Sequence, residues 1–228
     1  MVEQVWYLPR DGYISMPWRN GAGVTHEIMR VPAQGEPFSW RLSLATVASN
    51  GPFSAYPGYQ RAVALVDGAG FRLDIKNARA QELRARGANG LFAGAAETDC
   101  ALVNGPCRDL SLMVREPGEI AAVTHLHIRD DVTVTAPPGM LQMLFVLNGQ
   151  VVCRKLQTSS ARTQAPSAAY TLNLHDTLII QGAQISWSVS EPVRAASEIL
   201  AMSFAPRASE RAIGAADENT VRPAKRVS

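Results

Sequence analysis

Leu144–Cys153 reads LFVLNGQVVC, a run of strand-forming residues that is interrupted by Asn-Gly and then resumes. Ala62–Leu73 reads AVALVDGAGFRL and follows the same plan, with Asp-Gly at the interruption. Such dipeptides accept a positive φ and favour tight hairpin turns. The sequence therefore predicts two similar hairpins, one in each half of the chain, and an internal repeat.

The rest of the chain alternates apolar and polar residues over short runs that are broken by Gly, Pro and Asn, which predicts many short strands. The hairpin near residue 149 is followed by a turn with Asp at its corner, Leu174–Leu178 (LHDTL), and this combination is the skeleton of the cupin barrel. We therefore expect an all-β fold of tandem cupin-like barrels, a bicupin of the jelly-roll type with few helices. Only Asn77–Arg86 looks helical, and a polar loop fits that segment equally well.

The expected organisation is an N-terminal barrel with a ligand site over residues 1–118, a second barrel over 119–205 and a polar, flexible tail over 206–228. The 228 residues are 46% hydrophobic and only 18% charged, as in turn-rich globular chains. The tail holds five basic and three acidic residues, which leaves 17 of each in residues 1–205. Because the body is formally neutral, we expect no nucleic-acid partner.

The compartment follows from three negative features of the sequence. The longest nearly unbroken apolar stretch, Met140–Leu147, is far too short to cross a bilayer. The opening residues MVEQVWYLPRDG carry neither the basic nor the apolar region of a secretory signal. The three cysteines form no CxxC pair, which fits a reducing compartment. We expect a cytoplasmic protein with no membrane partner.

Metal-binding cupins hold their ion with an HxH pair about a dozen residues before the hairpin glycine, followed by a Glu and a later His. The corresponding positions here hold Ser54 and Tyr56 in the first half and Thr135 and Pro137 in the second. None of these offers an imidazole to a first-row metal. The expectation is that neither half binds a metal or another cofactor.

His125 and His127 lie two residues apart and point the same way if they lie on a strand, with His175 far downstream. A metal-dependent dioxygenase built on these three residues is one hypothesis. The favoured interpretation is two histidines on a connecting strand, because the pair lies too far ahead of the second hairpin and His175 falls in a turn.

The N-terminal third carries the densest chemistry. Met16–Ile28 (MPWRNGAGVTHEI) places Arg19 and Asn20 before a Gly-Ala-Gly turn and then alternates Thr25 and Glu27 with apolar neighbours. Backbone N–H groups of such a turn could cradle an anion. The stretch lacks the ending of a phosphate loop, so a hairpin or bulge is the simpler interpretation.

Phe38–Val47 (FSWRLSLATV) alternates so that Arg41, Ser43 and Ala45 share one face of a strand. If Thr25 and Glu27 share that face, they form a polar cluster with an Arg-Glu ion pair. Such a cluster is either a solvated sheet face or a polar barrel interior, which requires a ligand to satisfy it. The sequence leaves both alternatives open.

Asn50–Arg61 (NGPFSAYPGYQR) combines two prolines and three aromatic residues with an arginine. Arg61 enters the next strand where a metal-binding cupin would hold its acidic ligand. Ser54, Tyr56 and Arg61 instead suit a carboxylate, because a guanidinium offers paired donors in a plane. A rigid surface loop is the alternative. The candidate ligand-binding residues are Arg19, Asn20, Thr25, Glu27, Arg41, Ser43, Phe53, Ser54, Tyr56 and Arg61.

These three segments, in this order, strongly resemble the HutD/Ves family. The resemblance extends through Phe92-x-Gly94, Gly105-Pro106 and Asp109–Met113 and then more weakly to about residue 205. It implies a cupin-like double-barrel fold, a genetic association with histidine utilisation and no established enzymatic activity. The chain has Gly94-Ala95 where relatives commonly have Gly-Asp, and Ser111 where they commonly have Asn, so its ligand can differ.

Two classes of function compete. The first is a non-catalytic sensor or regulator that binds a small carboxylate, such as an intermediate of histidine breakdown. The alternative is a metal-independent cupin enzyme, an isomerase, hydrolase or lyase, with Glu27 as general base and Arg41 or Arg61 holding the substrate carboxylate. The interpretation leans against an enzyme because no nucleophile and base pair is evident. A structural role, with a homodimer formed through edge strands, stays open.

Overall fold

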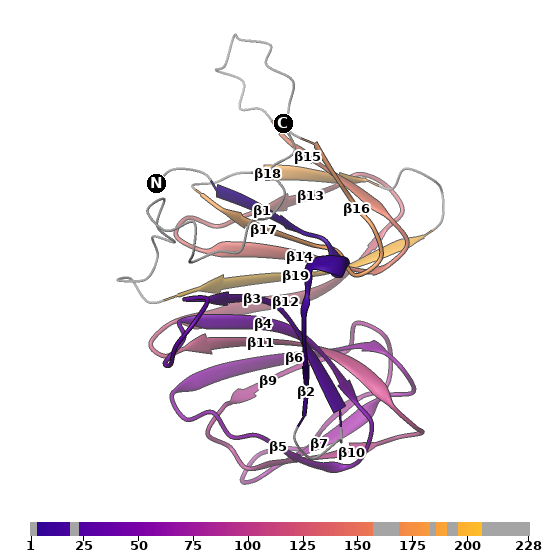
Figure 1. Ribbon diagram of the computed structural model, residues 1–228. Helices are drawn as coiled ribbons and strands as arrows, with labels where there is room; N and C mark the ends of the chain where they lie inside the picture. Colours follow the sequence, from indigo (N-terminus) through magenta and orange to yellow (C-terminus); the bar gives the residue numbers. More distant parts are fainter. Residues whose placement is uncertain (1–3, 19–22, 157–168, 183–185, 191–195, 207–228) are drawn as a thin grey trace. The chain divides into compact units, whose positions relative to one another are not determined.

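The computed structural model describes residues 4–18, 23–156, 169–182, 186–190 and 196–206, and this part of the chain consists of antiparallel strands (Figure 1). Its only helical element is a single 3-10 turn, η1 (Arg10–Gly12). The all-β prediction is confirmed. Residues 77–86 contain turns and the short strand β8 (Gln81–Leu83) instead of a helix. Within the described residues, no helix is long and apolar enough to span a membrane.

The chain divides into two compact units. The described part of the first unit lies within residues 12–123 and 204–206, and that of the second lies within residues 4–11 and 124–203. This division differs from the expected one, which placed the first residues in the N-terminal barrel. Strand β1 (Gln4–Leu8) instead pairs with β17 (Thr177–Gln181). Sequence order alone does not determine which sheet edge a terminal strand joins, so the expected division missed this pairing.

The first unit contains two sheets. A six-stranded sheet has the order β2 (Ile14–Pro17), β3 (Gly23–Val31), β4 (Trp40–Val47), β11 (Cys107–Arg115), β6 (Tyr59–Asp67) and β9 (Asn89–Ala93). A four-stranded sheet has the order β5 (Gly51–Phe53), β10 (Thr98–Leu102), β7 (Phe71–Ile75) and β8. A buried apolar cluster that includes Val63, Leu65, Phe71 and Leu73 joins the facing sides of the two sheets.

The second unit also contains two sheets. Its five-stranded sheet has the order β1, β17, β14 (Leu141–Asn148), β19 (Ser197–Ala205) and β12 (Glu119–Ile128). Its four-stranded sheet has the order β13 (Val132–Thr135), β18 (Ser186–Ser190), β15 (Val151–Lys155) and β16 (Ala169–Leu172).

The strand orders repeat. The series β4-β11-β6-β9 of the first unit recurs as β12-β19-β14-β17, and β5-β10-β7-β8 recurs as β13-β18-β15-β16. Each strand of the second series follows its counterpart by eight places in the element order. The internal repeat inferred from sequence is therefore present in the topology of the chain.

The two predicted hairpins have the expected turns but the wrong partners. Gly68 and Gly149 have positive φ angles of 98° and 75°. Strand β6, however, pairs with β11 and β9, whereas β7 pairs with β10 and β8. Residues 62–66 are fully buried, as expected of a central strand that already has a neighbour on each side. Each corner therefore carries the chain from one sheet to the other, and the hairpin prediction was wrong.

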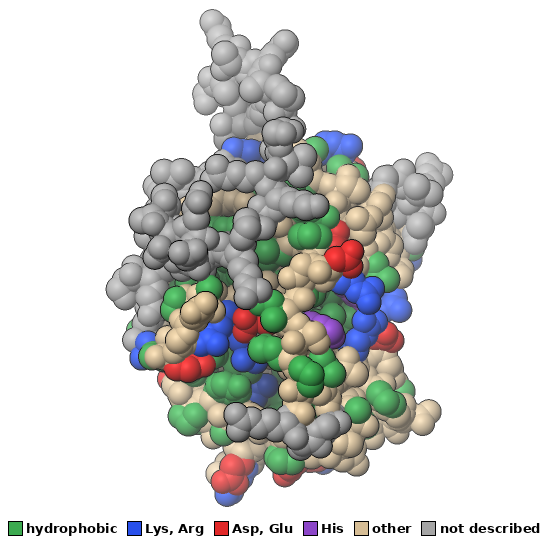
Figure 2. All heavy atoms as spheres, viewed as in Figure 1, with side chains coloured by type: hydrophobic (Ala, Val, Ile, Leu, Met, Phe, Trp, Pro, Cys, Tyr) green, Lys and Arg blue, Asp and Glu red, His purple; other side chains and the backbone are tan. Residues whose placement is uncertain are grey.

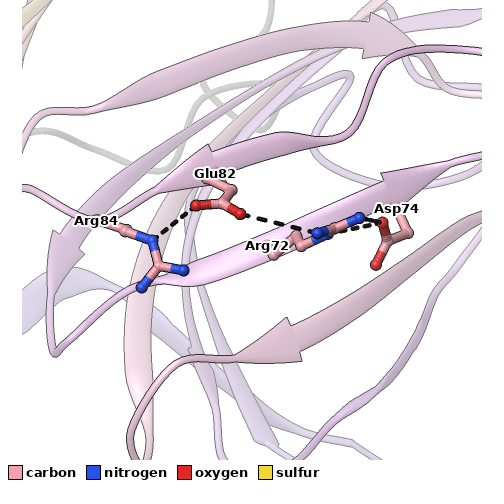
Figure 3. A network of polar contacts seen from close by, with 4 residues as sticks. All are labelled: Arg72, Asp74, Glu82 and Arg84. Atoms are coloured by element: carbon pink, nitrogen blue, oxygen red, sulfur yellow. Dashed lines mark hydrogen bonds and ion pairs between the residues drawn. The ribbon is translucent and has the colours of Figure 1, made fainter.

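The outward side of the β7-β8 pair is polar. Figure 3 shows Arg72 between Asp74 and Glu82, with Arg84 on the other side of Glu82. These side chains are exposed, so the pairs contribute little to stability. On the face of the molecule in Figure 2, basic and acidic side chains likewise lie next to one another. The alternating residues of β7 point inward and are buried, so the outward face carries the charges and the inward face carries the core.

Candidate ligand-binding site

A cavity of about 540 Å³ lies in the first unit, a volume within the range of small-molecule sites. One wall comes from the six-stranded sheet, and another comes from the segment around residues 52–56. Its lining residues are Met16, Pro17, Trp18, Thr25, Arg41, Ser43, Ala45, Val47, Pro52, Phe53, Ser54, Tyr56, Arg61, Asp109, Ser111 and Met113.

Strand register explains why polar residues from distant segments meet here. Residues directly opposite each other in an antiparallel pair have side chains on the same face of the sheet. Ser43 lies opposite Ser111. One step along the same face, Arg41 lies opposite Met113, and Met113 lies opposite Arg61. Alternation along β4 and β11 therefore assembles a polar patch on the inner face of the sheet.

Arg61 is the most constrained cation of the cavity. Its side chain is buried, and its Nη1 donates a hydrogen bond of 3.0 Å to the Ser54 carbonyl oxygen. The guanidinium carbon lies 5.3 Å from the ring centroid of Phe53, 5.7 Å from that of Tyr56 and 5.2 Å from that of Phe92. Burial lowers the pKa of Arg61, and the nearby charge of Asp109 acts in the opposite direction. The Nε atom has no protein partner.

Asp109 supplies the anionic group. It is 2% exposed and lies on β11 opposite Leu65. Burial raises the pKa of Asp109 to about 7, against the opposing effect of Arg61. Within the part of the chain that the structure describes, Asp109 forms no ion pair with Arg61, and its Oδ1 atom has no protein partner. The carboxyl group can therefore hold or release a proton near neutral pH.

Two further polar groups complete the set. The guanidinium carbon of Arg41 lies 5.8 Å from the ring centroids of both Phe38 and Tyr56, and its Nε is buried without a protein partner. The Ser111 hydroxyl is also buried and unpartnered. Buried polar atoms are normally hydrogen-bonded. Arg41, Arg61, Asp109 and Ser111 each contribute one such unpartnered atom, and all four residues line the same cavity.

Trp18 fixes the segment at one side of the cavity. Its indole Nε1 donates a hydrogen bond of 2.8 Å to the Thr25 hydroxyl, and its backbone N–H donates to the Gly23 carbonyl. A Cβ atom on Gly23 would lie 3.1 Å from the Trp18 ring and would collide with the Thr46 carbonyl oxygen. Glycine at position 23 is therefore a steric requirement of this wall.

Gly94 holds the segment that carries the aromatic residues of the cavity. The N–H of Tyr56 donates to the Gly94 carbonyl at 2.6 Å, and the N–H of Gly94 donates to the Tyr59 carbonyl at 2.7 Å. A Cβ atom on Gly94 would lie 2.8 Å from the Tyr59 oxygen. Together with the contact of Phe92 to Arg61, this close approach accounts for the Phe92-x-Gly94 motif.

Most of the residues singled out from sequence meet at the cavity. The lining includes Thr25, Arg41, Ser43, Phe53, Ser54, Tyr56 and Arg61. Arg19 and Asn20 lie outside the described residues. Glu27 lies opposite Ser43 but is not among the lining residues, and within the described residues it forms no ion pair with Arg41.

The residue that sequence reasoning missed is Asp109. A signal was present, because Asp109 and Ser111 alternate with apolar residues in the middle of β11, which places both on one face of the strand. The two departures from the family pattern, Ala95 and Ser111, differ in their position relative to the cavity. Ser111 lines the cavity, whereas Ala95 is exposed and does not.

The histidines of the dioxygenase hypothesis do not form a single cluster among the described residues. The Nε2 atom of His125 lies 2.9 Å from the Glu198 Oε2 atom, and His127 is their neighbour. His175 occupies a turn with a φ of 67°, as expected, and its ring stacks on Phe145 instead.

The fold defines the class of protein. Its topology repeats a pair of antiparallel sheets, and it is similar to that of AerE from Microcystis aeruginosa, with a TM-score of 0.63 at 9% identity over 87% of this chain and 98% of the other. A vicilin from Capsicum annuum gives a TM-score of 0.62 at 8% identity, over 89% of this chain and 86% of the other. At such identities the likeness shows the fold alone. It is an all-β, cupin-like fold.

The chain belongs to the HutD family, whose model matches residues 10–201. The structure of a conserved protein of unknown function from Pseudomonas aeruginosa PAO1 is similar, with a TM-score of 0.76 at 28% identity over 90% of this chain and 100% of the other. HutD from Pseudomonas fluorescens SBW25, solved in a formate condition, gives a TM-score of 0.67 at 26% identity, also over 90% and 100%.

Among curated sequences, an uncharacterised protein in the hutC 3′ region of Pseudomonas putida is 36% identical over 49% of this chain and 59% of its own length. Protein Ves of Citrobacter koseri is 39% identical over 43% of this chain and 51% of its own length. The chain therefore spans little more than half the length of the curated relatives it matches.

Proposed function

We propose that the first unit binds a small carboxylate and that the chain acts as a non-catalytic sensor or regulator linked to histidine utilisation. The observation that carries the proposal is the set of four buried, unpartnered polar atoms around one cavity. Leaving such atoms without a partner costs about 1–3 kcal/mol each. The same four residues line the cavity, so a ligand that pairs with these atoms after small side-chain shifts would recover part of this cost.

The chemistry of the four groups selects the ligand. The Nε atoms of Arg41 and Arg61 are donors, and charge-assisted bonds from guanidinium to carboxylate are among the strongest hydrogen bonds in proteins. Asp109 and Ser111 can accept a hydrogen bond from a polar group elsewhere on the ligand. A small carboxylate with a second polar group meets both requirements.

The link to histidine utilisation rests on the relatives. One lies in the hutC 3′ region of Pseudomonas putida, and another is named HutD. Intermediates of histidine breakdown such as formylglutamate, formiminoglutamate and urocanate all carry carboxylates. We include in the proposal that each unit is a cupin-like barrel and that the protein is cytoplasmic. Buried, unpaired thiols at Cys100, Cys107 and Cys153 support a reducing compartment.

Calorimetric titration with these three compounds tests the proposal. We expect one of them to bind with one ligand per chain, and Arg61→Gln to weaken binding at least 30-fold. Arg108→Gln is the matched control, because Arg108 lies on the same sheet but pairs with Asp67 at the surface. Folded protein that binds none of the compounds at millimolar concentration would refute the proposal. Equal affinity in the Arg61→Gln and Arg108→Gln variants would refute this site.

A second candidate function is a metal-independent enzyme that acts on the same carboxylate. The observation in its favour is Asp109, a buried carboxyl group in the cavity whose pKa is raised to about 7, as suits a general acid or base. NMR spectra of each compound incubated with the protein provide the test. Turnover that Asp109→Asn abolishes while binding persists would establish the enzyme. Binding without conversion in the wild-type protein would exclude it for these compounds.

A further inference from the structure

A second cluster of potential ligands lies outside the cavity, in the second unit. His125 and His127 lie on β12, which is the edge strand of the five-stranded sheet, and Glu198 lies on the neighbouring strand β19. Leu126 and Ile199, which alternate with these residues, pack into the core of the unit. His125, His127 and Glu198 therefore lie on the face of the sheet that is turned away from this core.

The geometry of the cluster is already compact. The His125 Nε2 atom lies 2.9 Å from the Glu198 Oε2 atom, and the ring centroids of the two histidines are 4.4 Å apart. One ligand atom from each of the three residues lies within 4.8 Å of the others. The side chains of His125 and Glu198 are 20% and 17% exposed, and His127 is exposed. An ion can reach the cluster from solvent.

We propose that His125, His127 and Glu198 form a binding site for a divalent transition-metal ion, with Zn²⁺ as the best-suited occupant. Imidazole nitrogen and carboxylate oxygen are ordinary zinc ligands, and ligands at about 2.0–2.1 Å from a tetrahedral ion lie about 3.4 Å from one another. Because the three atoms already lie within 4.8 Å, small side-chain rotations reach that geometry. His127 can make most of this adjustment because it is exposed. A water molecule would occupy the fourth position.

Two features favour a metal over a simple His-Glu hydrogen bond. A hydrogen bond needs only His125 and Glu198. The imidazole of His127 lies beside them, two residues further along the same face of β12, and a strand is a rigid element that holds such ligands in place. An ion shared by β12 and β19 would also join the edge strand to its neighbour and stabilise the folded chain by mass action. The site lies in the other unit from the cavity, so it does not depend on the proposed carboxylate binding.

The test uses the full-length, untagged protein after removal of metals with a chelator. Titration with ZnCl₂ at neutral pH should show one ion per chain with a dissociation constant in the micromolar range or below. We expect His127→Gln and Glu198→Gln each to weaken binding at least tenfold. His26→Gln is the matched control, because His26 lies on β3 in the first unit. The protein with this substitution should bind zinc as tightly as the wild type does.

Substitution with Co²⁺ adds an independent measurement, because a site with nitrogen and oxygen ligands in a tetrahedral arrangement gives strong visible absorption. His127 is exposed, so His127→Gln should leave the thermal unfolding of the metal-free protein unchanged. Absence of stoichiometric zinc binding at 100 µM metal would overturn the proposal. Zinc binding that is equally tight in the His127→Gln, Glu198→Gln and His26→Gln variants would overturn it as well, because the ion would then bind elsewhere.

Discussion

The two units share one strand order but differ inside. Arg61 and Gln142 lie on the equivalent strands β6 and β14, each seven residues before the positive-φ glycine at the end of its strand, Gly68 or Gly149. Arg61 has a buried Nε atom without a partner and faces a cavity. Gln142 donates to the Met202 carbonyl and accepts from the Ser203 hydroxyl. The same position thus carries an unsatisfied group in one unit and a satisfied group in the other.

The neighbouring strand shows the same contrast. Asp109 and Ser111 line the cavity from β11. Ser203 bonds to Gln142, and Met113 lies opposite Arg61, so Ser203 on β19 corresponds to Met113 on β11. Four and two residues earlier, Ile199 and Ala201 on β19 correspond to Asp109 and Ser111 on β11. Ile199 and Ala201 both belong to an apolar cluster that also contains the fully buried Trp187. The strand order is therefore shared by both units, whereas the cavity lined by Arg41, Arg61 and Asp109 belongs to the first unit.

The largest expected effect comes from moving a carboxyl group into the filled unit. Ile199→Asp places in the apolar cluster the side chain that the first unit carries at position 109. An unpaired buried charge costs about 3–5 kcal/mol, so we expect a loss of that size in the free energy of unfolding, measured by urea titration. Ile199→Val removes a single methylene and serves as the control, at about 1 kcal/mol. A loss for Ile199→Asp no greater than for Ile199→Val would contradict the contrast between the two interiors.

Asp109→Asn should raise the free energy of unfolding, whereas Ile199→Asp should lower it. The folded-state pKa of Asp109 is raised from 3.8 to about 7, so the unfolded chain releases this proton first as pH rises, and stability falls between about pH 4 and 7. Removing the ionisable group removes that fall, by at most about 4 kcal/mol at 1.36 kcal/mol per pKa unit. Urea titrations should find the variant more stable than the wild type at pH 8 and similar to it at pH 4. A difference independent of pH would show that Asp109 ionises normally.

Single substitutions at the matched positions 61 and 142 should separate binding from stability. Arg61→Lys keeps the charge but loses the planar donor pair, so carboxylate affinity should fall about tenfold with little change in unfolding temperature. Gln142→Leu leaves the Ser203 hydroxyl and the Met202 carbonyl without their partner, which should cost about 1–3 kcal/mol of stability and leave carboxylate affinity unchanged. Calorimetric titration and thermal unfolding of both variants provide the check. Reduced affinity in Gln142→Leu would assign a binding role to the second unit.

The smallest effect is expected at the wall of the cavity. Trp18→Phe keeps an aromatic ring but loses the hydrogen bond to Thr25, worth about 1 kcal/mol. Thermal unfolding should therefore show a small decrease, and carboxylate affinity should change by only a few-fold. A loss of affinity as large as that of Arg61→Gln would mean that the indole contacts the ligand directly.

Alternation and turn chemistry were sufficient to predict an all-β chain with an internal repeat. Arg41 and Ser43 fell on one face because side chains alternate along a strand, and Arg61 was singled out because it enters its strand where a metal-binding cupin would hold its acidic ligand. Strand pairing could not be predicted in the same way. Residues 62–66 are apolar on both faces, which indicates a central strand but does not name its neighbours. The pairing of β1 with β17 likewise joins segments about 170 residues apart, for which no local signal exists.

Asp109 shows the limit for the site itself. A single aspartate in an apolar strand is visible in the sequence, but its raised pKa depends on burial and on the position of Arg61, which only the packed sheets determine. Glu27 was the more prominent carboxylate in sequence because it lies in the motif-rich first segment. The structure makes Asp109 the carboxyl group of the cavity.

A crystal structure of the protein with its tightest-binding carboxylate tests the central claim most directly. The account predicts one ligand in the first unit, with its carboxylate hydrogen-bonded to Arg61 or Arg41 and a second polar group near Asp109 or Ser111. A ligand bound at another surface, or a cavity without ligand at a concentration that saturates binding in solution, would contradict the account.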